Sequence, residues 1–350
     1  MTKRRKFLAS ALGLAATACV PRMGWARTAQ PEIFQRIFPK RLQRGDTIGL
    51  IAPGYAIKVD VLDEAKTALK AMGFKPYHTN RIVGNYGYFS NTDFERAQDL
   101  DEMFADPKIA GILCARGGYG CTRILSLIDF GNIKKYPKAL IGFSDVTALL
   151  NGIYKKTGLI GFHGPVGSTL SDPYSMKQLR QVVMNPSDTL TINNKYPLDF
   201  ILKTNPEYER YTITQGMATG KLVGGSLTLI CALIGTPFEI DFTDAIVCIE
   251  DVEEAPYRID RMLTQLIGGE TFRKAAGIVF GVCAGCNEAT NPNSFSLKEV
   301  ILDRIQPLHI PAVYGMSFGH IEHSFTFPIG INAKLDTQRM RLQLLEKTVM

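Results

Sequence analysis

Between residues 45 and 165 the sequence alternates short apolar runs with amphipathic segments. The apolar runs read as buried strands at 45–54, 110–115, 140–143 and 159–162. Residues spaced as on one helix face fill the segments 61–72, 92–104 and 147–155 between them. Such alternation predicts an open, mostly parallel sheet with helices on both faces. Ligands of these sheets bind at the carboxyl ends of strands, so polar residues at those ends are the first candidates for a site.

The chain has 350 residues, which suggests more than one domain. Residues 43–165 form the predicted α/β domain. Residues 166–213, rich in Pro and Asn with one helical patch at 176–184, form a predicted connector. A second domain is predicted over 214–345. Its expected elements are a turn entering a helix at 220–227, strands at 245–249, 277–282 and 312–314, helices at 257–266 and 297–305, and a half-exposed strand at 339–344.

Residues 1–26 have the composition of an export signal. A basic start, Lys3-Arg4-Arg5-Lys6, precedes a weakly apolar run and a small-x-small site ending at Ala26. The Arg-Arg-x-Phe-Leu core resembles a twin-arginine signal, and the run is too short and too poor in Leu and Ile for a stable membrane span. We therefore expect a periplasmic protein. Lipid anchoring at Cys19 is the less favoured alternative, because Ala16 stands where Leu or Val is usual.

Charge gives no argument for nucleic acid as a partner. The net charge is +7, and residues 1–26 contribute five of these charges and no acid, which leaves about +2 for the rest.

Seven cysteines occur, and Cys283-Ala-Gly-Cys286 is the single Cys-x-x-Cys pair. No second pair completes a zinc site, so we expect structural thiols; a disulfide between these two is less favoured.

The stretch Gly142-Phe143-Ser144-Asp145 marks a strand that turns directly into a helix. Such a turn exposes its serine and directs free helix N–H groups at whatever binds there, as a nucleophile and oxyanion donors require. Taken alone, the stretch favours a helix cap at Ser144 or Asp145 over a nucleophile. Glu250 and His320 are the other polar residues at strand ends. Together with Ser144 they supply the three groups of a serine hydrolase, in the order Ser-Glu-His.

Other local motifs are weaker. The Gly-x-Ser-x-Gly elbow is absent, because Val146 stands at the second glycine. The turn 116–120, Arg-Gly-Gly-Tyr-Gly, could cradle a phosphate but lacks the Lys-Ser/Thr ending of a P-loop; its N–H groups suit an oxyanion equally. His320-Ile321-Glu322-His323 lacks the histidine spacing of zinc peptidases, so we expect no metal and no cofactor.

Several motifs together resemble the LD-carboxypeptidases, the muramoyltetrapeptide carboxypeptidases of serine peptidase family S66. The resemblance covers residues 45–330 and includes the stretches 116–120, 142–145, 163–165, 224–227, 249–261 and 319–320. It implies a Ser144, Glu250, His320 triad, with an oxyanion hole from the N–H of Asp145 and one N–H of the Gly117-Gly118 turn. Glu253 and Glu254 rival Glu250, which we prefer because it directly follows a strand.

The resemblance also implies fold and activity. The expected fold is a doubly wound, flavodoxin- or glutamine-amidotransferase-like parallel sheet, followed by a β-rich α+β domain, often in a homodimer. The implied activity releases the terminal D-alanine from murein tetrapeptides, after diaminopimelate or lysine. Two alternatives stay open. One is a microcin-immunity-like peptidase acting on peptidyl-nucleotide antibiotics, against which the export signal counts. The other is an exported protein that binds murein peptides without cleaving them.

Overall fold

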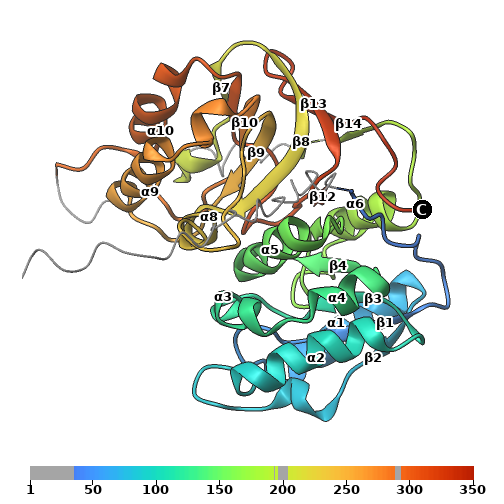
Figure 1. The fold of residues 1–350 in the computed structure, drawn as a ribbon. Coiled ribbons are helices and arrows are strands. Elements are labelled where there is room, and N and C mark those ends of the chain that lie inside the picture. Colours follow the sequence, from blue (N-terminus) through green and yellow to red (C-terminus); the bar gives the residue numbers. More distant parts are fainter. Residues whose placement is uncertain (1–34, 193, 196–203, 288–292) are drawn as a thin grey trace, which may run out of the picture. The chain divides into compact units, whose positions relative to one another are not determined.

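The structure, a computed structural model, describes residues 35–192, 194–195, 204–287 and 293–350, all within the unit Gln35–Met350. The expectations for the signal at residues 1–26 and for Cys19 lie outside these residues. Two sheets organise the described chain (Figure 1). Short 3-10 helices connect several elements: η1 Asn80–Val83, η2 Leu125–Leu127, η3 Ser144–Val146, η4 Pro206–Tyr208, η5 Phe272–Lys274 and η6 Gln306–Leu308.

The first sheet has six strands in the order β12-β5-β4-β3-β1-β2. The strands are β1 Thr47–Ile51, β2 Lys75–Tyr77, β3 Ile109–Cys114, β4 Ala139–Gly142, β5 Phe162–His163 and β12 Phe327–Pro328. The first five pair in parallel, in the order 2-1-3-4-5 that is typical of flavodoxin-like folds. The predicted doubly wound sheet is therefore confirmed. β12 adds an antiparallel edge from near the other end of the chain.

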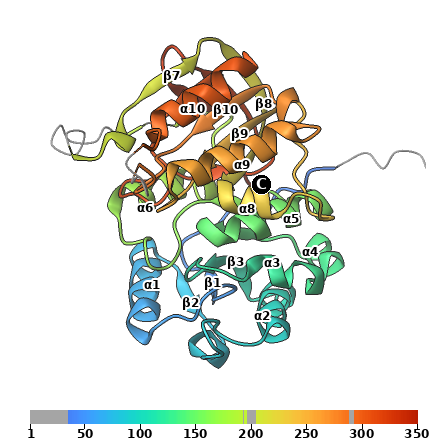
Figure 2. The same ribbon diagram turned by 90° about the vertical axis from the view of Figure 1, so that its left-hand side faces the viewer.

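Helices cover both faces of this sheet. They are α1 Val59–Met72, α2 Asp93–Ala105, α3 Cys121–Ile124, α4 Phe130–Lys135 and α5 Thr147–Thr157. Figure 2 shows α1 on one face and α2 and α4 on the other. α1 buries its Leu and Ala stripe and ends at Gly73, whose φ of 92° closes the last turn. α2 begins with a capping box in which Thr92 and Glu95 satisfy each other's backbone N–H groups. These helices confirm the predicted periodic segments.

The second sheet has eight strands in the order β6-β14-β13-β8-β9-β10-β11-β7. Their bounds are β6 Leu190–Ile192, β7 Tyr211–Thr214, β8 Met217–Ser226, β9 Ala245–Glu250, β10 Gly277–Phe280, β11 Ala312–Tyr314, β13 Asn332–Asp336 and β14 Arg341–Leu344. The helices α8 Leu227–Ala232, α9 Pro256–Gly268 and α10 Leu297–Ile305 belong to the same part of the chain. β8 to β11 run in parallel and the outer pairs are antiparallel. The predicted β-rich α+β character is confirmed.

The segment 166–213 does more than link the two sheets. It contains α6 Pro173–Val183, which the helical patch predicted, and it contributes β6 and β7 to the second sheet. The prediction of a turn entering a helix at 220–227 is wrong for 220–226, which belong to the ten-residue strand β8, whereas the expected helix is present as α8 from Leu227. The glycines that suggested a turn serve close packing instead. A Cβ on Gly225, whose φ is 138°, would lie 2.4 Å from Thr147 Oγ1.

Two sets of contacts join the two sheets whose neighbouring segments carry the site residues. Asn151 of α5 donates from Nδ2 to the carbonyl of Gly224, and its Oδ1 accepts the Gly224 N–H, at 2.9 and 3.1 Å. Thr147, at the start of α5, accepts the Ser226 N–H. The segment that follows β11 then returns to the first sheet, where Phe327 of β12 pairs with His163 of β5. The segment carrying His320 is thus anchored to the second sheet at one end and to the first at the other.

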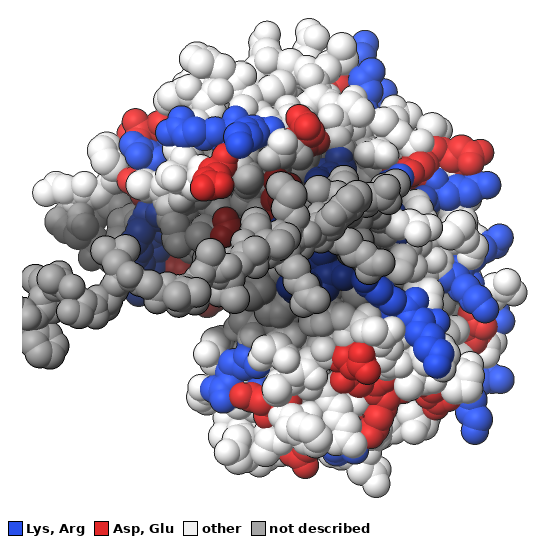
Figure 3. Space-filling model, in the orientation of Figure 1, with Lys and Arg blue, Asp and Glu red and all other residues white. Residues whose placement is uncertain are grey.

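On the face drawn in Figure 3, acidic and basic side chains of the described residues are interspersed. Of the helices that the structure describes between residues 35 and 350, none has the length and apolar character needed to cross a bilayer.

Candidate active site

Ser144 lies two residues after the end of β4, at the first residue of the 3-10 turn that leads into α5. Its φ is 62°, a left-handed conformation that is costly for a residue with a Cβ. The residues at the two cap positions, Phe143 and Val146, make no side-chain cap hydrogen bond. The Ser144 hydroxyl instead faces His320. The cap interpretation therefore does not describe Ser144, and the strained turn presents its side chain as a nucleophile elbow does.

Glu250, His320 and Ser144 form a continuous run of hydrogen bonds. His320 Nε2 lies 3.0 Å from Ser144 Oγ, and His320 Nδ1 lies 2.9 Å from Glu250 Oε2. A carboxylate only accepts, so we assign the imidazole proton to Nδ1 in the neutral ring. Nε2 then presents a lone pair to the serine hydroxyl. This is the arrangement that a general base needs to remove a hydroxyl proton.

Burial and charge set the protonation states of this pair. The Glu250 side chain is fully buried and that of His320 is 23% exposed. Burial opposes ionisation of Glu250, but the charge and hydrogen bond of His320 outweigh it and hold the pKa of Glu250 below its usual value. Burial also disfavours the charged imidazole, yet Glu250 raises the pKa of His320 above the ordinary histidine value. The carboxylate thus stabilises the imidazolium that forms when His320 takes a proton.

The rival carboxylates lie elsewhere. Glu254 pairs with Arg258 at 3.4 Å on the surface of α9. The backbone N–H of Glu253 donates to Ala284, and a φ of 56° turns the chain there. Glu250, at the end of β9, is the carboxylate that hydrogen-bonds to His320.

Asp145 and the turn 116–120 meet beside Ser144. Asp145 Oδ2 accepts the Cys121 N–H at 2.8 Å and so holds the start of α3, which follows the turn, against the nucleophile. Asp145 thereby caps a neighbouring helix instead of its own. A Cβ built on Gly117 would lie 3.1 Å from Ser144 Oγ and 3.2 Å from the Asp145 nitrogen. Gly117 therefore packs directly against Ser144 and the Asp145 backbone nitrogen, and a side chain at this position would displace the serine.

This geometry predicts that Gly117→Ala lowers kcat by at least about 100-fold, the loss typical of a damaged oxyanion site. The new methyl group would lie only 2.8 Å from Ser144 Cβ, so either the serine or the turn must move. The measurement is steady-state kinetics on the purified variant. Gly268→Ala in α9 is the control, because nothing lies within 4 Å of its Cβ position. Equal, small effects of both changes would contradict the prediction.

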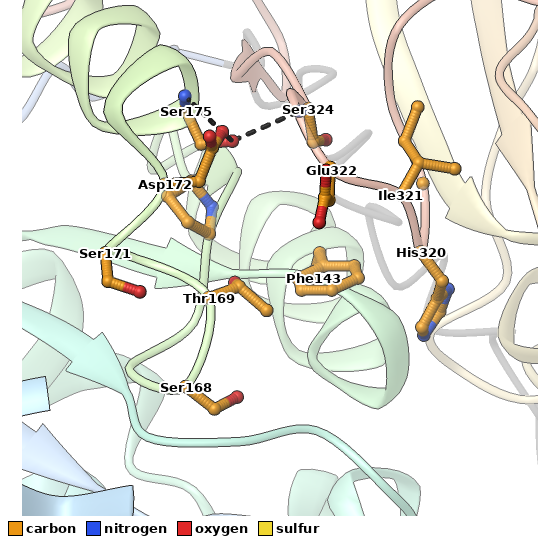
Figure 4. Close-up of a pocket in the computed structure, with 12 residues that line it drawn as sticks. Phe143, Ser168, Thr169, Ser171, Asp172, Ser175, His320, Ile321, Glu322 and Ser324 are labelled. Atoms are coloured by element: carbon orange, nitrogen blue, oxygen red, sulfur yellow. Dashed lines mark hydrogen bonds between the residues drawn. The ribbon is translucent and has the colours of Figure 1, made fainter. Parts of the chain in front are cut away.

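A pocket of about 580 Å³ opens beside His320. Hydroxyl groups line much of it: Ser168, Thr169, Ser171, Ser175 and Ser324. Asp172 and Glu322 add two carboxylates, and the described residues of the lining include neither Lys nor Arg. In Figure 4 the Glu322 side chain lies between Asp172 and His320 and points toward Phe143. The pocket is therefore acidic and rich in hydrogen-bonding groups.

The two histidines of the 320–323 motif have different partners. His323 Nδ1 lies 3.0 Å from Asp172 Oδ1, whereas His320 faces Glu250 and Ser144. Asp172 also caps α6 through the Ser175 N–H. Among the described residues no group of three or more His, Cys, Asp and Glu side chains could hold a metal ion. The six cysteines in that part of the chain, Cys283 and Cys286 included, are free thiols.

Comparisons with known proteins identify the family. Residues 48–164 match the family model "LD-carboxypeptidase N-terminal domain", and residues 219–335 match "LD-carboxypeptidase C-terminal domain". The chain belongs to the LD-carboxypeptidase family. A probable murein peptide carboxypeptidase of Bacillus subtilis is 38% identical over 304 residues, which are 85% of this chain and 91% of the relative.

Two further similar proteins bear on function. The murein tetrapeptide carboxypeptidase of Pseudomonas aeruginosa is 30% identical over 303 residues, 84% of this chain and 94% of its own. The crystal structure of an MccF-like protein from Bacillus anthracis superposes with a TM-score of 0.79 at 27% identity, covering 89% of this chain and 99% of the other. MccF is the microcin C7 self-immunity protein of Escherichia coli. As a member of the LD-carboxypeptidase family, the chain is a serine-type carboxypeptidase, and the predicted resemblance is confirmed.

Proposed function

We propose that this LD-carboxypeptidase releases the terminal D-alanine from murein tetrapeptides, with Ser144, His320 and Glu250 as its catalytic triad. The observation that carries the proposal is the unbroken run of hydrogen bonds from Glu250 through His320 to Ser144. The similarity to a murein tetrapeptide carboxypeptidase supports the substrate class.

In the proposed reaction His320 takes the hydroxyl proton while Ser144 Oγ attacks the carbonyl carbon that precedes D-alanine. The N–H of Asp145 and one N–H of the Gly117-Gly118 turn stabilise the oxyanion. His320 then gives its proton to the departing amine of D-alanine, which leaves an acyl-enzyme. Water, deprotonated by His320, cleaves that ester and restores Ser144. Glu250 holds the ring and stabilises its charged form in both halves.

The acidic pocket supports a substrate with an amino group near the cleaved bond. Murein tetrapeptides carry such a group on the side chain of their third residue, diaminopimelate or lysine. The carboxylates of Asp172 and Glu322 line the same pocket as His320, and no Lys or Arg stands among the described residues of that lining. Asp172 is already held by Ser175 and His323. Glu322 is exposed, so we assign it the contact with the substrate ammonium.

Glu322→Gln should lower kcat/KM for a tetrapeptide with L-lysine at the third position by about fivefold, the scale of one solvent-exposed ion pair. The same change should leave hydrolysis of a tetrapeptide with L-norleucine there unaffected, because norleucine has no ammonium group. Competition assays between the two peptides measure the ratio directly. Glu270→Gln, which removes an exposed carboxylate beyond α9, is the matched control. A parallel loss with both peptides would rule out the assigned contact.

Mass spectrometry of D-alanine release tests the proposed activity. The purified protein should convert a murein tetrapeptide to the tripeptide plus D-alanine. The similarity to the MccF-like protein favours one rival, hydrolysis of an aminoacyl-sulfamoyl nucleotide. Cleavage of that nucleotide alone, with the tetrapeptide left intact, would establish the rival. Binding of the tetrapeptide with neither substrate cleaved would support a role in murein-peptide binding.

We further propose export by the twin-arginine route and assembly as a homodimer. The basic start and small-x-small site of residues 1–26 support export, and the resemblance to the family supports the dimer. Fractionation of cells after replacing Arg4 and Arg5 with Lys tests the first, since the protein should then stay in the cytoplasm. Light scattering on the purified protein tests the second by its molar mass.

A further inference from the structure

His163 lies at the end of β5 with its side chain 1% exposed. Its Nε2 is 3.9 Å from Glu250 Oε1, on the opposite side of the carboxylate from His320. Among the described residues neither of these two buried atoms has a hydrogen-bond partner. Buried polar atoms are almost always satisfied, so two that face one another form a pair that needs an explanation.

Aromatic side chains fix the plane of the His163 ring. It stacks on Phe327 with centroids 4.4 Å apart and planes at 17°, and Phe318 and Phe143 pack against it at 6.4 and 6.0 Å. On another side, a Cβ at Gly225 would lie 2.9 Å from His163 Cδ2. The backbone of His163 pairs with Gly142 on one side and with Phe327 on the other. The ring therefore cannot turn far from Glu250.

The charge state of His163 suits a donor to the carboxylate. Burial lowers the pKa of His163 to about 4, so its ring is neutral at physiological pH and has one N–H, for which Glu250 Oε1 and the backbone carbonyl of His163 itself are the competing acceptors. The ionisable groups that face it are Glu250 of β9 and His320 of the segment between β11 and β12. Glu250 is the anion of this set, and a proton on Nε2 would point at its free oxygen. Catalytic hydrogen bonds are often long before substrate binds, and 3.9 Å is a contact that a small movement would close.

We propose that His163 is a positioning residue that donates from Nε2 to Glu250 Oε1 and thereby keeps the other carboxylate oxygen directed at His320. Glu250 is then held between two imidazoles, one that accepts protons during the reaction and one that stays neutral. A donor on Oε1 also withdraws charge from the carboxylate. The Glu250 carboxylate then stabilises the protonated form of His320 less strongly. This inference rests on the proposed function for its kinetic consequences, although its electrostatic consequence can be measured without substrate.

The test uses three variants and two readouts. His163→Phe keeps an aromatic ring without a donor, and His163→Gln keeps an amide donor near the position of Nε2. Phe327→Leu disturbs the stacking and leaves His163 in place. NMR titration of protein labelled with 15N-histidine, which contains five histidines, follows the pKa of His320 directly. Steady-state release of D-alanine gives kcat.

We expect His163→Phe to move the titration of His320 to higher pH, because the carboxylate regains its full charge, and to lower kcat at least about tenfold. His163→Gln should restore much of both, and Phe327→Leu, which loosens the stack that fixes the His163 ring, should move the His320 titration in the same direction as His163→Phe but by less. The proposal is overturned if His320 titrates alike in the wild type and in His163→Phe. It is also overturned if Gln and Phe produce equal shifts. If His163→Phe does not fold, the other two variants still decide the proposal. It is overturned if His320 titrates as in the wild type in Phe327→Leu but at a different pH in His163→Gln. If wild-type protein releases no D-alanine, the proposed function fails while the titration still decides this inference.

Discussion

Ser144→Ala should reduce kcat for D-alanine release by about 10⁶-fold, the loss seen when a serine hydrolase loses its nucleophile. The oxygen that would form the acyl bond is removed, and His320 Nε2 then faces a methyl group in place of the hydroxyl 3.0 Å away. Binding of the tetrapeptide should persist, because the pocket beside His320 is unchanged. Isothermal titration and mass spectrometry of the reaction measure binding and turnover separately. Ser126→Ala, on the exposed 3-10 helix η2, is the control for loss of a hydroxyl group.

The strained backbone adds a second expected result at this position. Because Ser144 has a φ of 62°, Ser144→Gly should be more stable to unfolding than Ser144→Ala by about 1 kcal/mol, although both are inactive. Denaturant unfolding of the two variants gives the difference. Residual turnover of Ser144→Ala near the wild-type rate would remove Ser144 from the mechanism. Equal stabilities would mean that the turn relaxes when the hydroxyl is lost.

The local features of the site were predictable because each depends on a short stretch of sequence. An apolar run followed at once by a polar residue and a helical pattern places Ser144 at a strand end, and the same reasoning places Glu250 at the end of β9. Their approach to His320 was not predictable in this way, since 176 residues separate it from Ser144 and 70 from Glu250. Spacing along the chain says nothing about such contacts. The family resemblance supplied the assignment that the residues alone left open.

The contact itself depends on elements that local patterns did not predict. β12 has two residues, too few for a periodic signal, yet it brings the segment after His320 back to β5. β8 was misread because Gly224 and Gly225 usually mark turns, whereas here the absence of side chains lets β9 and α5 approach the strand. His163 belongs to the stretch 163–165 that contributes to the family resemblance, but the sequence assigned it no role. Its significance comes from Glu250, which only the folded chain brings near.

Glu250→Gln should lower kcat by about 10⁴-fold, as expected when a triad carboxylate becomes a neutral amide. An amide at this position can donate to His320 Nδ1, which favours the tautomer with the proton on Nε2 and removes the lone pair that the Ser144 hydroxyl needs. Gln also lacks the charge that stabilises the imidazolium during proton transfer. The fold should survive, because the side chains have the same shape and the position is held within β9.

The direction in which Glu250→Gln shifts the pH profile of activity can also be predicted. Activity requires neutral His320, so kcat/KM of the wild type should rise with pH through a pKa above the ordinary histidine value. In Glu250→Gln the burial that lowers the pKa of His320 remains, while the Glu250 contribution that raises this pKa is lost. The residual activity should therefore rise at lower pH than in the wild type.

Glu253→Gln is the sharpest control. Glu253 raises the same pKa less than Glu250 does, and among the described residues it makes no hydrogen bond to Ser144 or to the imidazole. We expect that variant to keep kcat within about twofold, the scale of a change at a side chain outside the reacting groups. A larger loss from Glu253→Gln than from Glu250→Gln would move the carboxylate of the triad from the end of β9 to the turn after it.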